Sequence, residues 1–569
     1  MRKLPLHSRS PIIHYSLFII LTKNLIHTHP LWRTLEIIPG ALAWLTFLVP
    51  VLLSFFFPNL VASFIIIYTI IWLFRSIKLS VNLFRSYRLV KKALHTNWQN
   101  VIDLNDHPER ISYEIKKLSQ AVNNKNSRNS ASPKIKLALK ETQKLQTDLV
   151  MLQQKGQYKK SKELVHAIIY VTYKESYGLI RESIKSYTLS KYPPSRIIFV
   201  FAGEERDQQN VLEISQKIKH EFGHKFRRFM ITIHPQNIPG EIKGKSANAT
   251  FAAKELKKIL DQEKIPYDNI IISNFDADTV VHPLYFTELT AKYLTTIDRT
   301  EKTYQPTHMF HNNIWDVPMI MRIIALSCTF WRMAESMEQD KYKSFSSRSL
   351  SFKMVIDVDY WDTAVIPEDS RQYWTAYAIY NGRHKLVPVY CPVYMDAVLS
   401  DTYLKTFRNQ YNQLRRWAWG VCDFPFMALN LWYHPHLKVS EKIRRIGEFL
   451  KNTFFWATGP ILITFSGFIP GLINADFRNT VLAYNLPNTM SDIMLLASGG
   501  IFVCAIISLI LIPKTHTRNF LGRLSLGLQW LLVPITSIFL SAIPALDAQT
   551  RLMFGKYLEY RVTEKARKK

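Results

Sequence analysis

The chain has little cysteine, and this shortage argues against a disulfide framework. Its 569 residues include four cysteines, and none of them are spaced as C-x-x-C or as zinc ligands: Cys328, Cys391, Cys422 and Cys504. We therefore expect the soluble part of the chain in a reducing compartment. The basic start "MRKLPLHSRS" leads into a short apolar run without a small-residue cleavage site. This pattern predicts an interfacial segment rather than a signal peptide.

Acidic residues are also comparatively scarce. The chain has 73 Lys and Arg against 44 Asp and Glu, a formal net charge of +29. Such an excess is typical of a cytosolic surface beside anionic lipid, or of a nucleic-acid-binding protein. No nucleic-acid-binding motif is present, whereas long apolar runs are. The composition therefore favours a membrane partner and no nucleic acid.

Two apolar runs near the start are long enough to cross a bilayer. The first covers 37–57 and carries no charge, and the second covers about 59–80 after a reversal at Pro58 and Asn59. Basic residues flank both outer ends of this hairpin. The positive-inside rule therefore predicts that both ends lie in the cytoplasm.

Three further apolar runs, 453–473, 489–512 and 525–546, follow residue 440. The first and third contain two prolines each, which predicts kinks or re-entrant segments. The basic tail, 549–569, favours the cytoplasm and therefore an even number of crossings. We expect four spans with a re-entrant segment at 525–546, and five spans as the alternative. Because the candidate spans lack ionisable residues at depth, the sequence does not favour a transporter.

The middle of the chain alternates strand-like and helix-like segments. The strand-like ones are "ELVHAIIYV", "SRIIFVFA", "FMITIH" and "DNIIISNF". This alternation predicts an α/β fold with a mostly parallel, Rossmann-like sheet that binds ligands at the carboxyl ends of its strands. The predicted organisation is an interfacial segment and hairpin (1–92), a polar and partly disordered arm (93–162), the α/β domain (163–425), an interfacial helix with a C-terminal membrane region (426–548), and the tail.

Two aspartates, Asp276 and Asp278, follow the last of these strands in "IIISNFDADTVV". Carboxylates are preferred ligands of Mg²⁺ and Mn²⁺, which are often completed by the phosphates of a substrate. If the segment stays extended, both side chains point the same way. The alternative is that these residues form a turn or a helix N-cap before "PLYFTELTAKYL".

A second acidic pair, Glu368 and Asp369, follows a proline in "VIPEDSRQYW". A carboxylate at a helix start stays ionised beside the helix dipole, which would suit Asp369 as a general base. The alternative is that Asp369 only caps the helix.

Two cationic motifs complete the set. In "NQLRRWAWG", Gln413, Arg416 and Trp417 share one helical face, which suits a diphosphate and a sugar ring or, alternatively, a membrane interface. In "GEIKGKSANAT", Lys245 opens a helix where an anion can bind, although a solvated lysine explains it equally well.

In order and spacing, "VTYKES", "KSAN", "DAD", "PED" and "QLRRW" resemble the motifs of the membrane-embedded family 2 glycosyltransferases, including the DxD and QxxRW motifs. This is the group of cellulose synthase, hyaluronan synthase and ceramide glucosyltransferase. "YQPTHMFHNN" is similar to the family segment after the metal motif. The resemblance covers about 164–425 and the flanking spans, and implies a GT-A-like domain.

By this resemblance, five residues would bind the nucleotide-sugar donor. Thr172, Tyr173 and Glu175 would contact the nucleoside, Lys245 would lie near the diphosphate, and Asp276 would contact the ribose or the metal.

The resemblance also implies the catalytic residues and the cofactor. Asp278, with Asp276, would hold Mg²⁺ or Mn²⁺, and Asp369, beside Glu368, would be the catalytic base. The diphosphate and the acceptor would be framed by Gln413, Arg416 and Trp417.

One departure concerns the donor base. In "VFAGEERD", Phe201 and Ala202 stand where the family has acids, and Glu204 or Glu205 is the candidate substitute. The expected function is inverting transfer of a sugar, with a UDP-sugar as the first choice of donor, to a polysaccharide or lipid acceptor. The expected location is the plasma membrane, with the catalytic domain in the cytoplasm. The alternative is a non-catalytic membrane scaffold with the same fold.

Overall fold

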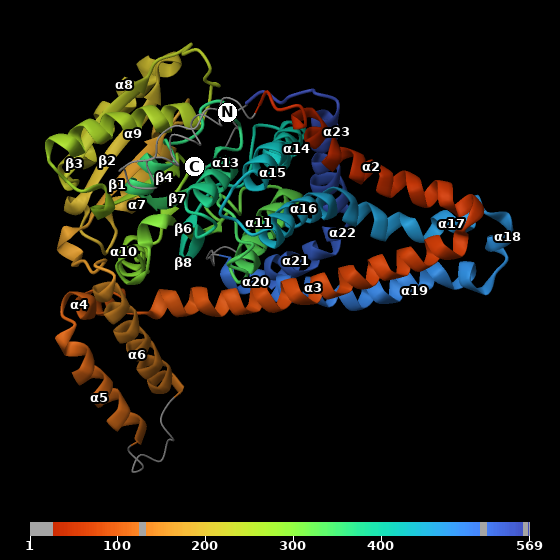
Figure 1. Cartoon of the computed structure of the whole chain (residues 1–569), viewed down its shortest axis with the longest axis horizontal. Helices are drawn as coiled ribbons and strands as arrows, with labels where there is room; N and C mark the ends of the chain where they lie inside the picture. Colours follow the sequence, from red (N-terminus) through yellow and green to blue (C-terminus); the bar gives the residue numbers. More distant parts are fainter. Residues whose placement is uncertain (1–26, 124–132, 513–519, 561–566, 568–569) are drawn as a thin grey trace.

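A computed structural model of the chain describes residues 27–123, 133–512, 520–560 and 567. It has an α/β domain at one end, and long helices extend away from it (Figure 1). The predicted N-terminal interfacial segment and most of the Ser/Asn/Lys tract lie outside the described residues. The four cysteines are unpaired, as expected.

The core of the α/β domain is an eight-stranded sheet with the order β3-β2-β1-β4-β7-β6-β8-β5. The strands are β1 (Val165–Val171), β2 (Ile197–Glu204), β3 (Arg228–His234), β4 (Ile270–Asp276), β5 (Val280–Val281), β6 (Lys302–Met309), β7 (Arg348–Ser351) and β8 (Lys385–Tyr394). The four predicted strands are β1 to β4, and they pair in parallel. Every residue of β1 and β2 is buried, because helices cover both faces.

The other half of the sheet is mixed. Strand β7 runs antiparallel to both β4 and β6, and β5 runs antiparallel to β8, whereas β6 and β8 are parallel. The expectation of a mostly parallel sheet is therefore not confirmed. The physical reason is that the chain returns to the sheet along β7 in the reverse direction.

The two faces of the sheet bury separate cores. Alternate side chains of β1 enter them, Ile168 and Tyr170 on one face and Ala167 and Ile169 on the other. The first face is covered by α7 (Tyr177–Thr188), α8 (Gln208–Phe222) and α10 (Tyr285–Thr295). The second is covered by α9 (Lys245–Gln262), α12 (Phe352–Asp357) and α13 (Glu368–Ile379).

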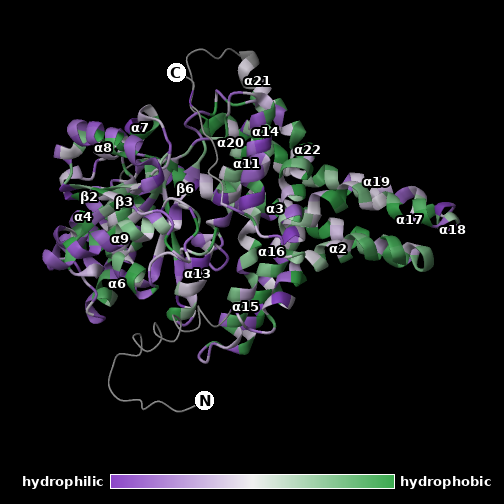
Figure 2. Cartoon of the chain, turned by 90° about the horizontal axis from the view of Figure 1, so that it is seen from above, coloured by the Kyte–Doolittle hydropathy of each residue, from purple (hydrophilic) through white to green (hydrophobic). Residues whose placement is uncertain are grey.

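Five helical segments of the described chain are long and apolar enough to cross a membrane: Trp32–Phe56, Pro58–His95, Val439–Ile473, Val481–Leu511 and Leu524–Met553. Each overlaps one predicted run, and hydrophobic residues dominate where α2, α17 and α19 extend from the body (Figure 2). Their elements are α2 (Trp32–Phe56), α3 (Pro58–His95), α16 (Val439–Phe465), η8 (Ser466–Phe468), α17 (Ile469–Ile473), α19 (Val481–Ala497), α20 (Gly499–Leu511), α21 (Phe520–Leu528), η9 (Gln529–Leu532), α22 (Val533–Ser537), η10 (Ile538–Ala542) and α23 (Ile543–Met553), with α18 (Ala475–Arg478) between α17 and α19.

The last segment is broken into short helices, and Pro534 and Pro544 each lie near the start of one of them. This agrees with the irregularity that its prolines predict. Whether four or five segments cross the bilayer stays a prediction.

The polar arm is helical where it is described. It contains the end of α3 together with α4 (Trp98–Asp106), α5 (Glu109–Asn123) and α6 (Pro133–Gln154). Helices α5 and α6 extend away from the body as a pair (Figure 1).

The remaining helices connect the sheet to the apolar bundle: α11 (Met319–Glu335), α14 (Tyr403–Ala418), η7 (Trp419–Asp423) and α15 (Phe424–Trp432). Seven of the nine residues of α15 are buried, and its aromatic side chains pack against α13 and α16. The expectation of an interfacial helix here stays a prediction. Beside α15, Arg371 and Asp423 form an ion pair of 2.8 Å with side chains 2% and 0% exposed.

Removing Asp423 takes away the closer of two carboxylates from the buried Arg371, whose other pair, with Asp362, is 3.3 Å long. We expect Asp423→Ala to destabilise the protein by about 3–5 kcal/mol, seen as a lower melting temperature of the purified protein. The matched control is Asp401→Ala, because Asp401 is 79% exposed in its pair with Lys405. Equal effects of the two substitutions would contradict the assignment.

Candidate active site

The first part of the site joins the end of β4 to the start of α9. Lys245 is the first residue of α9, as predicted, and its Nζ lies 2.6 Å from Oδ1 of Asp276 at the end of β4. Ser346 completes a triangle with them. Its hydroxyl lies 2.8 Å from Lys245 Nζ and donates to Asp276 Oδ2 over 2.6 Å.

The two aspartates of the DAD motif have different partners. The chain turns directly after Asp276, so the condition for both side chains to point the same way is not met. Asp278 is buried, and its Oδ2 accepts a hydrogen bond of 2.8 Å from the backbone N–H of Asp396. The Asn312 amide donates to the Asp278 carbonyl (2.9 Å) and to Asp396 Oδ1 (2.7 Å). Sequence reasoning did not single out Asn312 or Asp396.

The second acidic pair begins α13, directly after Pro367. Asp369 forms an ion pair with Arg348, whose side chain is buried. Burial lowers the pKa of Arg348 to about 10, and this value is still high enough for the guanidinium to be charged at neutral pH. Glu368 is 8% exposed, and burial raises its pKa, although the charges of Lys245 and Arg348 oppose this shift. The two neighbouring carboxyls therefore have different environments.

A short segment that ends at the first residue of β7, residues 344–348, contacts several of the predicted motifs, and we call it the connector. Ser344 donates a hydrogen bond of 2.5 Å to the Asp369 carbonyl, and Arg348 pairs with the carboxylate of the same residue. The ring of Phe345 meets that of Trp417 edge to face, with centroids 5.5 Å apart. With Ser346, the connector thus touches the DAD, PED and QxxRW motifs.

Ser347 gives the connector its shape. It is fully buried and has a φ of +54°, which is uncommon for a residue other than glycine. Its hydroxyl lies 2.7 Å from Thr279 Oγ1 and accepts from the Asp276 N–H over 3.2 Å. These contacts hold the turn after β4 against the connector.

The QxxRW residues lie at the end of α14. Gln413 is buried and accepts a hydrogen bond of 3.3 Å from Gln410. Trp417 packs between Phe345 and Phe310 in an aromatic wall. Arg416 lies beside Tyr560, with its guanidinium carbon 5.4 Å from the ring centre.

Two residues near the C-terminus also belong to this region. A Cβ built on Gly244 would lie 3.4 Å from the Tyr560 ring, so this ring sits beside the start of α9. Arg567 donates to Asp396 over 2.8 Å and to the Asp278 carbonyl over 3.4 Å. From the sequence we expected only a basic tail here. The charge of a tail does not indicate which surface of the protein the tail contacts.

The predicted nucleoside-binding residues follow β1. Thr172 Oγ1 and the Tyr173 N–H donate to one carboxylate oxygen of Glu175, over 2.7 and 2.5 Å. The Arg206 guanidinium lies over the Tyr173 ring at 3.7 Å and pairs with Glu204 at 2.5 Å. Glu204 is therefore connected to this loop.

The departure from the family pattern has a structural correlate. Phe201 and Ala202 are fully buried in β2, inside the two cores of the sheet. Of the two candidate substitutes, Glu205 accepts a hydrogen bond of 2.8 Å from the Gln236 N–H, on the side of β3. Glu204 is thus the better candidate for a contact with the nucleoside.

The oxygen ligands near Asp278 suit a hard divalent cation. Asp278 and Asp396 are both buried, and the positive charge of Arg567 already balances Asp396. Within the described residues, no group of three or more His, Cys, Asp or Glu side chains is placed to hold a metal. A bound Mg²⁺ or Mn²⁺ would therefore take its other ligands from water and a diphosphate, as such ions commonly do.

No protein-family model matches the chain, and no curated protein matches it in sequence. Among solved structures, it is similar to the mannosyltransferase PcManGT from Pyrobaculum calidifontis in complex with GDP-Man and Mn²⁺. That match has 13% identity and a TM-score of 0.35, and covers 69% of this chain and 88% of the other. It is also similar to TarS 1-349 of S. aureus in complex with UDP, with 12% identity and a TM-score of 0.30, covering 71% and 95%. At these values, the likeness carries no argument about what this chain does.

The triangle of Lys245, Asp276 and Ser346 predicts an effect on nucleotide binding. Ser346→Ala removes two hydrogen bonds to charged groups, each worth about 1.5–3 kcal/mol. We expect the affinity for UDP or GDP to fall by about tenfold or more, measured by calorimetry on the purified protein. Ser190→Ala, at a hydroxyl that hydrogen-bonds to the Pro283 carbonyl and the Tyr192 N–H, is the control and should bind normally. Unchanged binding by Ser346→Ala would refute the role of the triangle.

Glu175 predicts a pH dependence. Burial raises the pKa of Glu175 to about 7, from an ordinary value of about 4.3. The stability that this group contributes is present at low pH and is lost as the pH rises through about 7. Over the same range, a negative charge appears beside the expected nucleotide site. We therefore expect the affinity for a nucleotide-diphosphate sugar to fall as the pH rises from about 6 to 8.

Glu175→Gln should abolish this fall, whereas Glu205→Gln should keep it. A fall of the same size in Glu175→Gln would assign the titration to another group.

Proposed function

We propose that the protein is a membrane-bound inverting glycosyltransferase, which moves a sugar from a nucleotide diphosphate to a polysaccharide or lipid acceptor. The observation that carries the proposal is the connector, which contacts the lysine, the carboxylates and the tryptophan of four separate motifs. A UDP-sugar is the first choice of donor. The proposal places the α/β domain in the cytoplasm and the long apolar helices in the plasma membrane.

The donor would lie between the loop after β1 and the start of α9. Thr172, Tyr173 and Glu175 would contact the nucleoside, with Glu204 nearby. Lys245 and Arg416 would lie along the diphosphate, where their charge stabilises the negative charge that develops as the bond to the sugar breaks.

The acceptor hydroxyl would be activated by Asp369. Its oxygen bonds to C1 of the sugar as the bond from C1 to the diphosphate breaks, and the proton passes to the Asp369 carboxylate. Arg348 forms an ion pair with this carboxylate, whereas burial raises the pKa of the neighbouring Glu368. Gln413 and Trp417 would orient the sugar and the acceptor.

A divalent cation at Asp278, with Asp276 and Asp396 nearby, would supply further positive charge for the leaving diphosphate. Because α14 is followed in the chain by η7, α15 and the apolar helix α16, the site would lie close to the proposed bilayer. This position suits an acceptor that reaches the site from the membrane.

Asp369→Asn should abolish transfer while donor binding survives. General acid–base catalysis commonly contributes about 10²–10⁴-fold, so turnover should fall by at least about 100-fold. The assay uses membranes that contain the full chain, radiolabelled UDP- and GDP-sugars, and Mg²⁺ or Mn²⁺. The product is sized and tested for solubility in lipid solvents.

Asp401→Asn, at an exposed carboxylate, is the control and should be fully active. Normal turnover by Asp369→Asn together with an inactive Glu368→Gln would move the base to Glu368. If the unmodified chain neither transfers nor hydrolyses any donor, the non-catalytic scaffold is the better account.

A further inference from the structure

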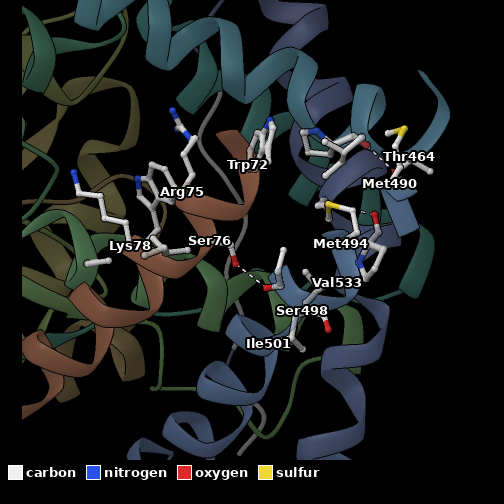
Figure 3. Close-up of a pocket in the computed structure, with 18 of the residues that line it drawn as sticks. Trp72, Arg75, Ser76, Lys78, Thr464, Met490, Met494, Ser498, Ile501 and Val533 are labelled. Atoms are coloured by element: carbon white, nitrogen blue, oxygen red, sulfur yellow. Dashed lines mark hydrogen bonds between the residues drawn. The ribbon is translucent and has the colours of Figure 1, made fainter. Parts of the chain in front are cut away.

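A large cavity lies among the apolar helices, outside the candidate active site. Its volume is about 780 Å³, within the range of small-molecule binding sites. It is lined by α3, α11, α16, α19, α20 and α22. Figure 3 shows Trp72, Arg75, Ser76 and Lys78 of α3 on one side, and Met490 and Met494 of α19 on the other.

The cavity has a charged end and an apolar end. On α16, Lys451 and Asn452 line it near one end, and Ile463 and Thr464 line it further along the helix. Lys451 and Ile463 are separated by 12 positions, about 18 Å in a helix. The apolar end also includes Met490, Met494 and Val533. The cavity therefore changes from polar to apolar along the axis of the proposed spans.

Cations outnumber carboxylates in its lining. Lys78 and Lys341 both pair with Glu338, each at 2.8 Å. The other lining carboxylate, Glu335, pairs with Arg332. This leaves Arg75 and Lys451, for which no ion pair with a carboxylate is found within the described part of the chain. The lining thus has a net positive charge.

Arg75 is held by aromatic rings. Its guanidinium carbon lies 4.3 Å from the centre of the Phe455 ring and 5.4 Å from that of Trp72. Trp72 fits closely because it faces Gly459, where a Cβ would lie 1.9 Å from the indole. Rings cover the face of the guanidinium, whereas its N–H donors lie at the edge and suit the oxygens of a phosphate.

We propose that this cavity binds one membrane lipid with an anionic, phosphate-bearing headgroup. Its headgroup lies at Arg75 and Lys451, and its chains lie along Met490, Met494 and Val533. A lipid fits better than a soluble anion, because most of the lining is apolar and the walls are helices that suit a bilayer. A charged residue beside the apolar part of a membrane helix commonly marks a ligand site.

The lipid site is separate from the donor site, and it remains a valid proposal even if the protein transfers no sugar. The two regions are in contact, and one of the contacts runs through α11. Glu335 in the cavity lining pairs with Arg332, whose guanidinium carbon lies 5.1 Å from the Phe345 ring of the connector. A bound lipid would therefore lie behind the aromatic wall of the candidate active site.

The test uses the purified full-length chain in detergent after removal of loosely held lipid. Native mass spectrometry counts the bound lipid after addition of phosphatidylglycerol or phosphatidylcholine. We expect one phosphatidylglycerol per chain and about tenfold weaker retention of phosphatidylcholine. The double variant Arg75→Gln with Lys451→Gln should lose this preference. The control is Arg85→Gln with Lys91→Gln, at exposed positions of α3 outside the cavity, and should keep it.

The apolar half has its own pair of variants. Met494→Trp fills the cavity and should reduce retention of both lipids by about tenfold or more, whereas Leu495→Trp, at a side chain that is 72% exposed, should not. Equal retention of both lipids by the unmodified chain, or equal loss in the control variants, would overturn the proposal. Displacement of the lipid by millimolar inorganic phosphate alone would identify a soluble anion as the ligand.

Discussion

The hydrogen bond from Ser346 to Asp276, together with the contacts that Lys245 makes to both residues, fixes the centre of the candidate site. It joins three segments that are far apart in the chain and belong to different elements: the end of β4, the start of α9 and the connector. The Asp276 carboxylate is half-buried beside an ammonium and needs such a partner, because an incompletely paired charge is costly where water is scarce. The other connector contacts extend the same arrangement to α13 and α14, so the position of each motif depends on this segment.

Charged side chains at the centre of the site lie in oppositely charged pairs. Lys245 lies against Asp276, Arg348 against Asp369, and Arg567 against Asp396. In a poorly solvated region, each pair restrains its neighbours, since moving one charge leaves another uncompensated. Asp369 lies in one of these pairs, whereas its neighbour Glu368 is buried and burial raises its pKa. The chemistry proposed for Asp369 and Glu368 follows from this contrast between two adjacent residues.

Much of the α/β domain could be predicted from periodicity, and the contacts within the site could not. Strands β1 to β4 and helices α7 to α9 coincide with apolar patterns that a sequence shows directly. The antiparallel return of β7 has no such signal, since Ser346 and Ser347 precede it in a serine-rich stretch without periodicity. Ser346 reaches Asp276 across 70 positions and Lys245 across 101. Pairing over such distances depends on the tertiary fold, and so does the approach of Tyr560 to Gly244.

Helices α3 and α11 connect the two halves of the molecule. The 38 residues of α3 extend over about 57 Å, so one helix lines the cavity with Trp72 and Arg75 and packs on the sheet core with Ala93. Helix α11 lines the same cavity and contacts Phe345 through Arg332. Because close-packed interiors transmit displacement, the side chains that define the cavity also position the connector. The geometry of the site therefore depends on how the apolar helices pack.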